Sequence, residues 1–411
     1  MNILIINHYA GNPNLGMEFR PYYLSKEWLK SGHNVSIIAS NYSHLRTNQP
    51  VTDKDLTEEI VEGIRYIWIA TPRYSASVIK RFINILVFVL KLFWYKTRLI
   101  KLIKPDVVIA SSTYPLDIYP AYYYAKKNKA KLCFELHDMW PLSPMIIGGY
   151  SKYHPFIWLM QKAENFACRK VDCYVSMLGN VEEYLAEHGL EKSKFIHIPN
   201  GFNSDERKFG KIELPENYSI LLDKLRNENK VIVGYAGGHS PSNALDSLID
   251  AASLLRENDK IVFVLVGTGP SKDALINKVK KMQLDNVIFL PPVIKQSVPS
   301  LVDKFDMVFI GGIRSELHKY GTSPNKITEY ILAEKPVIFS IDEPNSLIEK
   351  VGCGYRVPAE DAKSIADAIY KMSTISSSER KEMGIRGSEY AIKNLNYEVL
   401  AEKFIQSIEA C

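Results

Sequence analysis

The sequence has few of the features that are typical of secreted proteins, of proteins stabilised by a structural metal, or of membrane-spanning proteins. Its five cysteines form no CxxC pair and no His/Cys ligand spacing, which argues against a disulfide framework or a zinc site and fits a reducing cytoplasm. Asp53 and Asp55 superficially match paired acids that hold a divalent ion, but they stand in a polar loop, VTDKDLTEE, where we expect them to be solvated. The first residues, MNILIINHYAG, lack the basic region, apolar stretch and cleavage site of a signal peptide, so we expect a buried first strand.

The chain also has only a small excess of positive over negative charge. The 51 basic and 46 acidic side chains leave a formal charge of +5, too small by itself to indicate a nucleic-acid partner. The excess is local, because residues 78–104 contain seven Lys or Arg and no acid. With 411 residues the chain is too long for one ordinary core, and two domains of roughly 200 residues each are expected.

Short apolar runs alternate with amphipathic segments of helical length, which predicts parallel sheets covered on both faces. The expected strands are residues 2–7, 35–40, 64–70, 106–111, 131–136, 173–177 and 195–199, then 231–237, 261–267, 286–291, 307–312, 336–340 and 354–358. A polar, charged stretch separates the two series. The predicted fold class is α/β, with two doubly wound Rossmann-like domains, residues 1–202 and 203–411, facing a cleft; the last helix is able to pack back on the first domain.

Ligands of such sheets bind at the carboxyl ends of the strands, so the loops that follow the strands are the candidate sites. FELHDMWP places His137 and Asp138 at such an end, where an imidazole and a carboxylate would face the cleft. A histidine there can hydrogen-bond a reacting substrate, although a lone histidine is more often structural. Gly16, Gly237 and Gly238 stand in loops where the backbone can approach a ligand closely, or they serve plain turns.

The stretch GTSPNKITEY carries a cation at an unusual place. Ser323 and Pro324 are typical of a helix start, as the N-cap and the first helical residue. Lys326 then falls in the first turn, where the helix dipole disfavours a cation unless an anion binds beside it. We therefore predict an anion at this helix start.

The basic segment 78–104 is compatible with two arrangements. On a single helix its polar side chains fall on one narrow stripe, and Phe, Ile, Leu and Val cover most of the rest; these polar residues are Lys80, Asn84, Lys91 and Arg98. The apolar stretch 82–90 is too short to span a bilayer, which needs about 20 apolar residues. Basic flanks with Phe, Trp and Tyr suit a helix lying on anionic lipid, and a helix buried against the first sheet fits equally well.

Nine motifs follow one another in a characteristic order: the loop with Gly16, then SGHNV, KPDVVIAS, ELHD, IPNGF, GTGP, NVIFLPPV, SPNKITEYILAEKPVI and GCGYRVP. Together they cover nearly the whole chain. The set resembles the retaining glycosyltransferases with two Rossmann-like domains (GT-B), the glycosyl transferases group 1 family. GMEFRPYYLSKEW and SPNKITEY are similar to variants in bacterial enzymes that build capsule or O-antigen repeat units.

The resemblance implies roles for particular residues. His137 matches the histidine that reaches the transferred sugar, and Glu329 matches the second glutamate of the E-x7-E motif, which binds the nucleotide ribose. The first glutamate falls at Gly321, and the family's Arg and Lys fall within residues 237–245, where neither occurs. Lys326 is the available substitute for the diphosphate contact. The expected catalytic residues are His137 and Lys326, and the expected donor-binding residues are Gly16, Gly238, Thr322, Ser323, Asn325, Lys326 and Glu329.

The resemblance also implies an activity. The implied reaction transfers a sugar from a nucleotide diphosphate sugar, UDP-linked, to a lipid-linked saccharide in bacterial surface polysaccharide biosynthesis. The sugar keeps its anomeric configuration, and no metal or cofactor is expected. The implied location is cytoplasmic, peripheral on the inner face of the cytoplasmic membrane, with contact through residues 78–104. A nucleotide-sugar epimerase of the same fold and a catalytically silent partner subunit remain as alternatives, the latter because the Arg, Lys and first Glu are lost.

Overall fold

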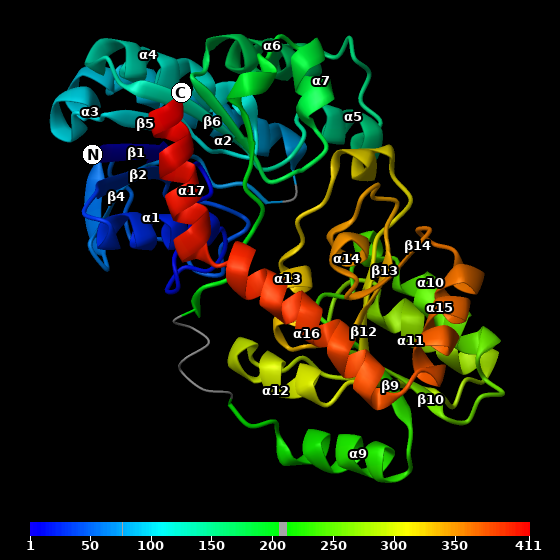
Figure 1. The fold of residues 1–411 in the computed structure, drawn as a ribbon. Helices are drawn as coiled ribbons and strands as arrows, with labels where there is room; N and C mark the ends of the chain where they lie inside the picture. Colours follow the sequence, from blue (N-terminus) through cyan, green and yellow to red (C-terminus); the bar gives the residue numbers. More distant parts are fainter. Residues whose placement is uncertain (76, 205–211) are drawn as a thin grey trace. The chain divides into compact units, whose positions relative to one another are not determined.

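The computed structural model describes residues 1–75, 77–204 and 212–411. The chain forms two compact units (Figure 1). The N-terminal unit consists of Met1–Asn200 and Tyr397–Cys411, and the C-terminal unit consists of Gly201–Asn396. Each unit is a parallel α/β sheet with its own buried core.

The sheet of the N-terminal unit has the strand order β3-β4-β2-β1-β5-β6-β7-β8, and every neighbouring pair is parallel except β3 with β4. Its strands are β1 (Asn2–Ile6), β2 (Asn34–Ser40), β3 (Thr57–Val61), β4 (Ile64–Ile69), β5 (Val107–Ala110), β6 (Lys131–Leu136), β7 (Cys173–Ser176) and β8 (Phe195–His197). Its helices are α1 (Arg20–Lys30), α2 (Val78–Trp94), α3 (Lys96–Ile103), α4 (Ile118–Asn128), α5 (Leu142–Gly148), α6 (Pro155–Lys170), α7 (Glu182–Glu187) and α17 (Tyr397–Ala410). The central strands are buried along nearly their whole length, as continuous apolar runs of parallel sheets require.

The C-terminal unit has the wholly parallel order β11-β10-β9-β12-β13-β14. The strands are β9 (Val231–Ala236), β10 (Ile261–Val266), β11 (Val287–Leu290), β12 (Met307–Gly311), β13 (Val337–Ser340) and β14 (Gly354–Val357). The helices are α9 (Glu216–Asn227), α10 (Leu245–Leu254), α11 (Lys272–Met282), α12 (Val298–Asp303), α13 (Asn325–Leu332), α14 (Leu347–Val351), α15 (Ala362–Thr374) and α16 (Ser377–Asn394). Each expected apolar run in both halves contains a strand, and the predicted fold class of two doubly wound α/β domains is confirmed.

One strand was not expected. β3 lies in the stretch predicted to be a polar loop, and it pairs antiparallel with β4 at the edge of the sheet. Most of its side chains face solvent, so its sequence, TEEIV, carries no apolar run. The prediction that Asp55 is solvated is also wrong, because its carboxylate accepts hydrogen bonds from Lys91 Nζ (3.0 Å) and from the Tyr95 hydroxyl (2.9 Å).

Residues 78–104 form two helices, α2 and α3, rather than one. The expected polar stripe does not face solvent as a whole, because Asn84 is buried and donates to Thr71 Oγ1 (2.8 Å), while Lys91 is held by Asp55. The opposite side of α2 instead exposes large apolar side chains: Ile79 (73% exposed), Leu90 (65%) and Trp94 (82%). Within the described ranges, no helix combines the length and hydropathy that crossing a bilayer requires.

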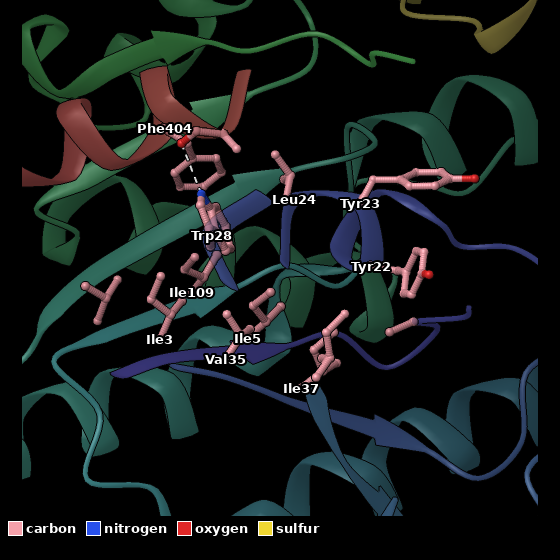
Figure 2. Close-up of a cluster of buried hydrophobic side chains, with 14 of the residues drawn as sticks. Ile3, Ile5, Tyr22, Tyr23, Leu24, Trp28, Val35, Ile37, Ile109 and Phe404 are labelled. Atoms are coloured by element: carbon pink, nitrogen blue, oxygen red, sulfur yellow. Dashed lines mark hydrogen bonds between the residues drawn. The ribbon is translucent and has the colours of Figure 1, made fainter. Parts of the chain in front are cut away.

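The last helix, α17, packs in the core of the N-terminal unit against α1 (Figures 1 and 2). The Trp28 indole meets the Phe404 ring edge to face, with 5.3 Å between the ring centroids, and its Nε1 donates to the carbonyl of Ala401 (3.0 Å). Tyr23 stacks on Tyr397 at 5.1 Å. The chain therefore returns to its first unit to complete that unit's core.

Candidate active site

In the N-terminal unit the loops after β1, β5 and β6 meet at one edge of the sheet. Ile6 lies beside Ala110, and Ala110 lies beside Phe134, so the residues that follow these three strands come together. Ser111 is the residue after β5, and His137 is the residue after β6. Their side chains touch, because His137 Nε2 lies 2.9 Å from Ser111 Oγ.

A buried carboxylate fixes the His137 ring. Its Nε2 also lies 3.1 Å from Glu135 Oε2, to which Ser111 Oγ donates a hydrogen bond of 2.6 Å. Nδ1, the other ring nitrogen, faces Glu18 Oε1 at 3.9 Å. The imidazole is only 4% exposed, so its position and its tautomer are set by these neighbours.

Glu135 is in turn paired with Arg20. Arg20 Nε donates to Glu135 Oε1 (2.9 Å), and its other two nitrogens donate to the carbonyls of Ile198 (2.8 Å) and Pro199 (2.6 Å). Sequence reasoning missed both residues. The available signal was an acid inside an otherwise apolar strand, KLCFEL, because a buried carboxylate needs a partner.

These charges set the protonation of the site. Burial alone would raise the pKa of Glu135, but the Arg20 guanidinium and His137 hold it well below its usual range. Burial alone would lower the pKa of His137, but the hydrogen bond and negative charge of Glu135, with Glu18 beside it, raise it above its ordinary value. His137 is therefore inclined to carry a positive charge near neutral pH, which suits it to bind an oxygen that bears partial negative charge.

Asp138 does not serve as a free carboxylate. Its oxygens accept hydrogen bonds from the backbone N–H of Met139 (2.8 Å), from Trp140 Nε1 (3.1 Å) and from Ser143 Oγ (2.6 Å). An Asp at a strand end is well placed to bond the backbone of its own turn, and whether this carboxylate faces a cleft stays a prediction. Asp138 shapes the loop that carries His137.

Gly16 lies in the loop after β1, where its backbone N–H donates to the carbonyl of Asn12 (2.9 Å). Its φ is +94°, and a Cβ there would stand 2.9 Å from Thr47 Oγ1. Both facts require glycine, since the left-handed region is costly for other residues. The loop shape thus explains this glycine without a ligand, and a phosphate contact at Gly16 remains a prediction.

In the C-terminal unit Lys326 lies against the glycine turn after β9. A Cβ on Gly237 would fall 2.4 Å from Lys326 Cε, so a side chain at this position would displace the end of the lysine. Lys326 Nζ donates to the Tyr235 hydroxyl (2.8 Å) and to Asn243 Oδ1 (3.2 Å), and it lies 4.7 Å from the centre of the Tyr235 ring. The fold therefore brings a cation to the stretch 237–245, which has none of its own.

The environment of Lys326 is poor in negative charge. Its hydrogen-bond partners are neutral, and within the described ranges it makes no ion pair with a carboxylate. Burial lowers its pKa to about 8, although the charge of Glu329 acts in the opposite direction. A half-buried ammonium group with neutral partners is a favourable place for an anion.

Helix α13 begins one residue later than expected. Pro324 is the N-cap and Asn325 is the first helical residue, so the prediction of Ser323 as N-cap was wrong. Proline has no side-chain group that could cap the first N–H groups of α13. Lys326 still lies in the first turn, as predicted.

A second cation, Lys272, binds the glycine turn after β10, which lies beside the Gly237 turn, and it was missed by sequence reasoning. Lys272 Nζ donates to the carbonyls of Gly267 (2.6 Å) and Leu290 (3.0 Å). The charges of Lys272 and Lys326 both act on His239, which is fully buried and has neither ring nitrogen hydrogen-bonded within the described chain. Burial and the two lysines lower the pKa of His239 to about 4, so the ring stays neutral.

The other expected donor-binding residues lie around the same two segments. The Gly238 carbonyl accepts from Tyr235 Oη (2.6 Å) and Asn243 Nδ2 (2.8 Å), which shapes the turn. The Thr322 hydroxyl donates to Glu343, a carboxyl that follows β13. Ser323 is half-buried, and Asn325 and Glu329 are exposed on α13 or at its start. None of these positions by itself tests a role in donor binding.

Two parallel α/β units, each with polar side chains at the carboxyl ends of its strands, define the GT-B class of protein. The Glycosyl transferases group 1 family model matches residues 230–374, and the Glycosyltransferase Family 4 model matches residues 16–206. The chain is thus a glycosyltransferase that carries both domains, and its resemblance to this group is confirmed.

Three relatives illustrate the similarity. The colanic acid biosynthesis glycosyl transferase WcaI of Escherichia coli K12 is 22% identical over 404 residues, with 93% of each chain covered. Among solved structures, HepE of Anabaena in complex with UDP and glucose superposes with a TM-score of 0.66 at 16% identity over 100% of both chains. Sucrose-phosphate synthase of Thermosynechococcus elongatus gives 0.70 at 16% identity, covering 99% of this chain and 98% of the other.

Proposed function

We propose that the protein is a retaining, metal-independent glycosyltransferase. It moves a sugar from a UDP-sugar to a lipid-linked saccharide during the synthesis of a bacterial surface polysaccharide, such as a capsule or O-antigen. The observation that carries the proposal is Lys326, a half-buried cation with neutral hydrogen-bond partners, held against the Gly237 turn in the first turn of α13. This arrangement suits a diphosphate leaving group.

The comparisons support the choice of donor and pathway. HepE and an Escherichia coli trehalose-6-phosphate protein are known in complexes with UDP, UDP-glucose or UDP-2-fluoro glucose. The name of WcaI assigns it to colanic acid biosynthesis. These relatives therefore support a UDP-sugar as the donor and a surface polysaccharide as the product of this protein.

The leaving diphosphate gains negative charge as the glycosidic bond breaks. The first N–H groups of α13 and the ammonium of Lys326 would then bind it more tightly in the transition state than in the ground state, which lowers the barrier. Lys272, held by two backbone carbonyls, adds positive potential at the neighbouring glycine turn after β10. With these groups in place, charge neutralisation of the diphosphate does not require a metal ion.

His137 would serve the transferred sugar. Its raised pKa favours the protonated ring, and Glu135 and Arg20 hold the ring in place. In the proposed reaction the acceptor hydroxyl attacks from the side of the leaving group, so that the product keeps the anomeric configuration of the donor. His137 then hydrogen-bonds a sugar oxygen and steadies charge near the anomeric carbon.

The lipid-linked acceptor requires access to a membrane. The exposed apolar side of α2, with Ile79, Leu90 and Trp94, and exposed Lys80 beside it suits a peripheral contact with anionic lipid at the cytoplasmic face. This contact would orient the N-terminal unit toward acceptors that remain in the bilayer.

The test incubates the purified protein with a panel of UDP-sugars and a lipid-linked saccharide fraction, and mass spectrometry follows the products. The expected result is release of UDP with an acceptor heavier by one sugar, unchanged by chelators, and a product anomer identical to the donor by NMR. New sugars formed without acceptor would indicate an epimerase instead. A melting temperature that does not rise with UDP would indicate a silent partner subunit.

A further inference from the structure

Three of the five cysteines lie together in the N-terminal unit. Cys133 of β6 and Cys173 of β7 are register partners, so they stand side by side in the sheet. Cys411 directly follows α17, and its N–H donates to the carbonyl of Ser407 (3.2 Å), which prolongs the last helical turn. We call Cys133, Cys173 and Cys411 the thiol cluster.

The thiol cluster lies where α17 covers the sheet. Cys133 and Cys173 belong to the buried core that also contains Ile405 and Ile408 of α17, so both thiols lie on the face of the sheet that this helix covers. Cys411 comes three residues after Ile408, and residues three apart lie on the same side of a helix. The Cys411 side chain therefore points toward the same strands.

Side-chain hydrogen bonds connect the three thiols through Cys173. The Cys173 thiol is hydrogen-bonded to Cys133 and to Cys411, and these bonds lower its pKa, although burial acts in the opposite direction. The charges of Lys131 and Asp172, beside the starts of β6 and β7, act on Cys411. Cys173 is therefore within reach of Cys411 and inclined toward the thiolate, which is the form that attacks sulfur.

The members of the thiol cluster differ in their access to solvent. Cys133 and Cys173 are buried, whereas Cys411 is exposed, so a dissolved oxidant meets Cys411 first. A bond between Cys133 and Cys173 is disfavoured, because the side chains of register partners stand nearly parallel on the sheet instead of pointing at each other. The arrangement therefore favours a bond between Cys173 and Cys411.

We propose that Cys173 and Cys411 form a modification site, at which a reversible disulfide links the end of α17 to β7. The co-reactant is a small-molecule disulfide such as glutathione disulfide. The Cys411 thiolate attacks one sulfur of glutathione disulfide and releases one glutathione, and the Cys173 thiolate then attacks the Cys411 sulfur and releases the second. Two protein thiols are oxidised, one glutathione disulfide is reduced, and the two thiol protons end on the two glutathione molecules.

The link would matter because α17 is far from the rest of its unit in the sequence. The chain leaves the N-terminal unit after Asn200 and returns at Tyr397, so the disulfide closes a loop that contains the whole C-terminal unit. Closing a long loop restricts the unfolded chain and thereby stabilises the folded N-terminal unit. Under reducing conditions the thiols stay reduced, so this added stability follows the redox state. The inference is independent of the proposed sugar transfer.

The test compares the full chain after incubation with glutathione disulfide and with dithiothreitol. Peptide mapping by mass spectrometry should find Cys173 joined to Cys411, so that two of the five thiols resist alkylation. The oxidised protein is expected to melt about 5 °C higher, and dithiothreitol should reverse the rise. Cys411→Ser changes an exposed side chain and leaves the core intact, and it should abolish both the link and the rise in melting temperature.

Cys133→Ala is the matched control within the thiol cluster. The folded variant should keep both the link and the rise, because Cys133 does not form the bond. A wild type that keeps all five thiols, or a link between Cys133 and Cys173, would overturn the proposal. Glutathione that stays on Cys411, or a covalent dimer through Cys411 on a non-reducing gel, would overturn it as well, since either shows that Cys173 does not reach Cys411.

Discussion

At the scale of single residues, the two candidate sites depend on charges that the fold has partly removed from water. Lys326 has neutral partners and a lowered pKa, while Glu135 is paired on both sides by Arg20 and His137. The first arrangement leaves a cation able to bind an anion, and the second locks an imidazole in position. Three predictions follow from this difference.

Removing the charge of Lys326 should weaken UDP binding without destabilising the fold. For Lys326→Met we expect an affinity for UDP about 10- to 100-fold lower by isothermal titration, because a charge-assisted phosphate contact is lost. Turnover should fall further, since the contact strengthens in the transition state. Lys319→Met, an exposed lysine shortly before α13, is the control; equal binding by the wild type and Lys326→Met would remove Lys326 from the site.

UDP affinity should also depend on pH above neutrality. Since burial lowers the pKa of Lys326 to about 8, the charged form that binds phosphate is depleted as the pH rises from 7 to 9.5, while phosphate groups, with a second pKa of about 6, stay fully ionised. Affinity should therefore fall across this range. Lys326→Arg stays charged, and its affinity should be flat; a flat wild-type profile would contradict the assignment.

Glu135→Gln should both destabilise the N-terminal unit and lower the pKa of His137. Losing the carboxylate leaves Arg20 buried without its counter-charge, at a cost of about 3–5 kcal/mol in unfolding free energy. The raised pKa of His137 means that its pairing stabilises the fold below the ordinary histidine pKa, and this contribution is lost as the pH rises through the raised value.

NMR titration of His137 and denaturant unfolding measure these two effects. Glu164→Gln is the control for Glu135, because Glu164 is equally buried but its hydrogen-bond donors, Gln161 and Tyr184, are neutral, and burial raises its pKa to about 7. His188 Nε2 lies 4.0 Å from its carboxylate, further than Arg20 lies from Glu135. Its change should cost much less. An unshifted His137 titration in Glu135→Gln would show that another group sets its charge.

At the scale of elements, helix α2 has two apolar sides, of which one is buried and the other is exposed. Ile85, Phe88 and Leu92 are buried in the unit, together with Asn84, while Leu90 and Trp94 remain in solvent. A surface helix normally needs only its inner stripe to be apolar, so the outer stripe calls for a partner, and the basic composition of the segment favours an anionic membrane.

Polar substitution of the outer stripe should therefore release the protein from membranes. The variant carrying Ile79→Ser, Leu90→Ser and Trp94→Ser is expected to lose most of its binding to phosphatidylglycerol-containing vesicles in a flotation assay, with little change in melting temperature. The control replaces three exposed apolar residues of the C-terminal unit by serine: Ile220, Leu254 and Ile392. Undiminished flotation of the α2 variant would rule out this stripe as the membrane contact.

At the scale of the whole molecule, the chain crosses between its units twice, and α17 belongs to the unit in which the chain began. Phe404→Ala should remove a buried ring from the N-terminal core and cost about 3–5 kcal/mol in unfolding free energy. In calorimetry we expect the transition of the N-terminal unit alone to shift, with UDP binding retained at low temperature. Val399→Ala, on the same helix but partly exposed, should change little, and an equal shift for both would contradict the proposed packing.

Much of this architecture could be predicted from local patterns. Apolar runs such as IVFVLV and VVIA must be buried on both faces, and the helical segments between them leave a parallel sheet as the only consistent arrangement. The sequence also predicted the glycine turn after β9 and the position of Lys326 in the first turn of a helix. Both features depend on backbone chemistry within a few residues.

The remaining features depend on contacts between distant residues. Arg20 and Glu135 are 115 positions apart, and nothing local to either shows that one neutralises the other. The orientation of α2 was likewise decided by Asp55 and Thr71, whose hydrogen bonds draw Lys91 and Asn84 inward and turn apolar side chains out. Periodicity thus determined that these segments are strands and helices, because it reflects local backbone geometry. Which charges meet, and which helical side stays exposed, was decided only by tertiary packing, because a buried charge is costly unless the fold brings it a partner, and that partner can be distant in the sequence.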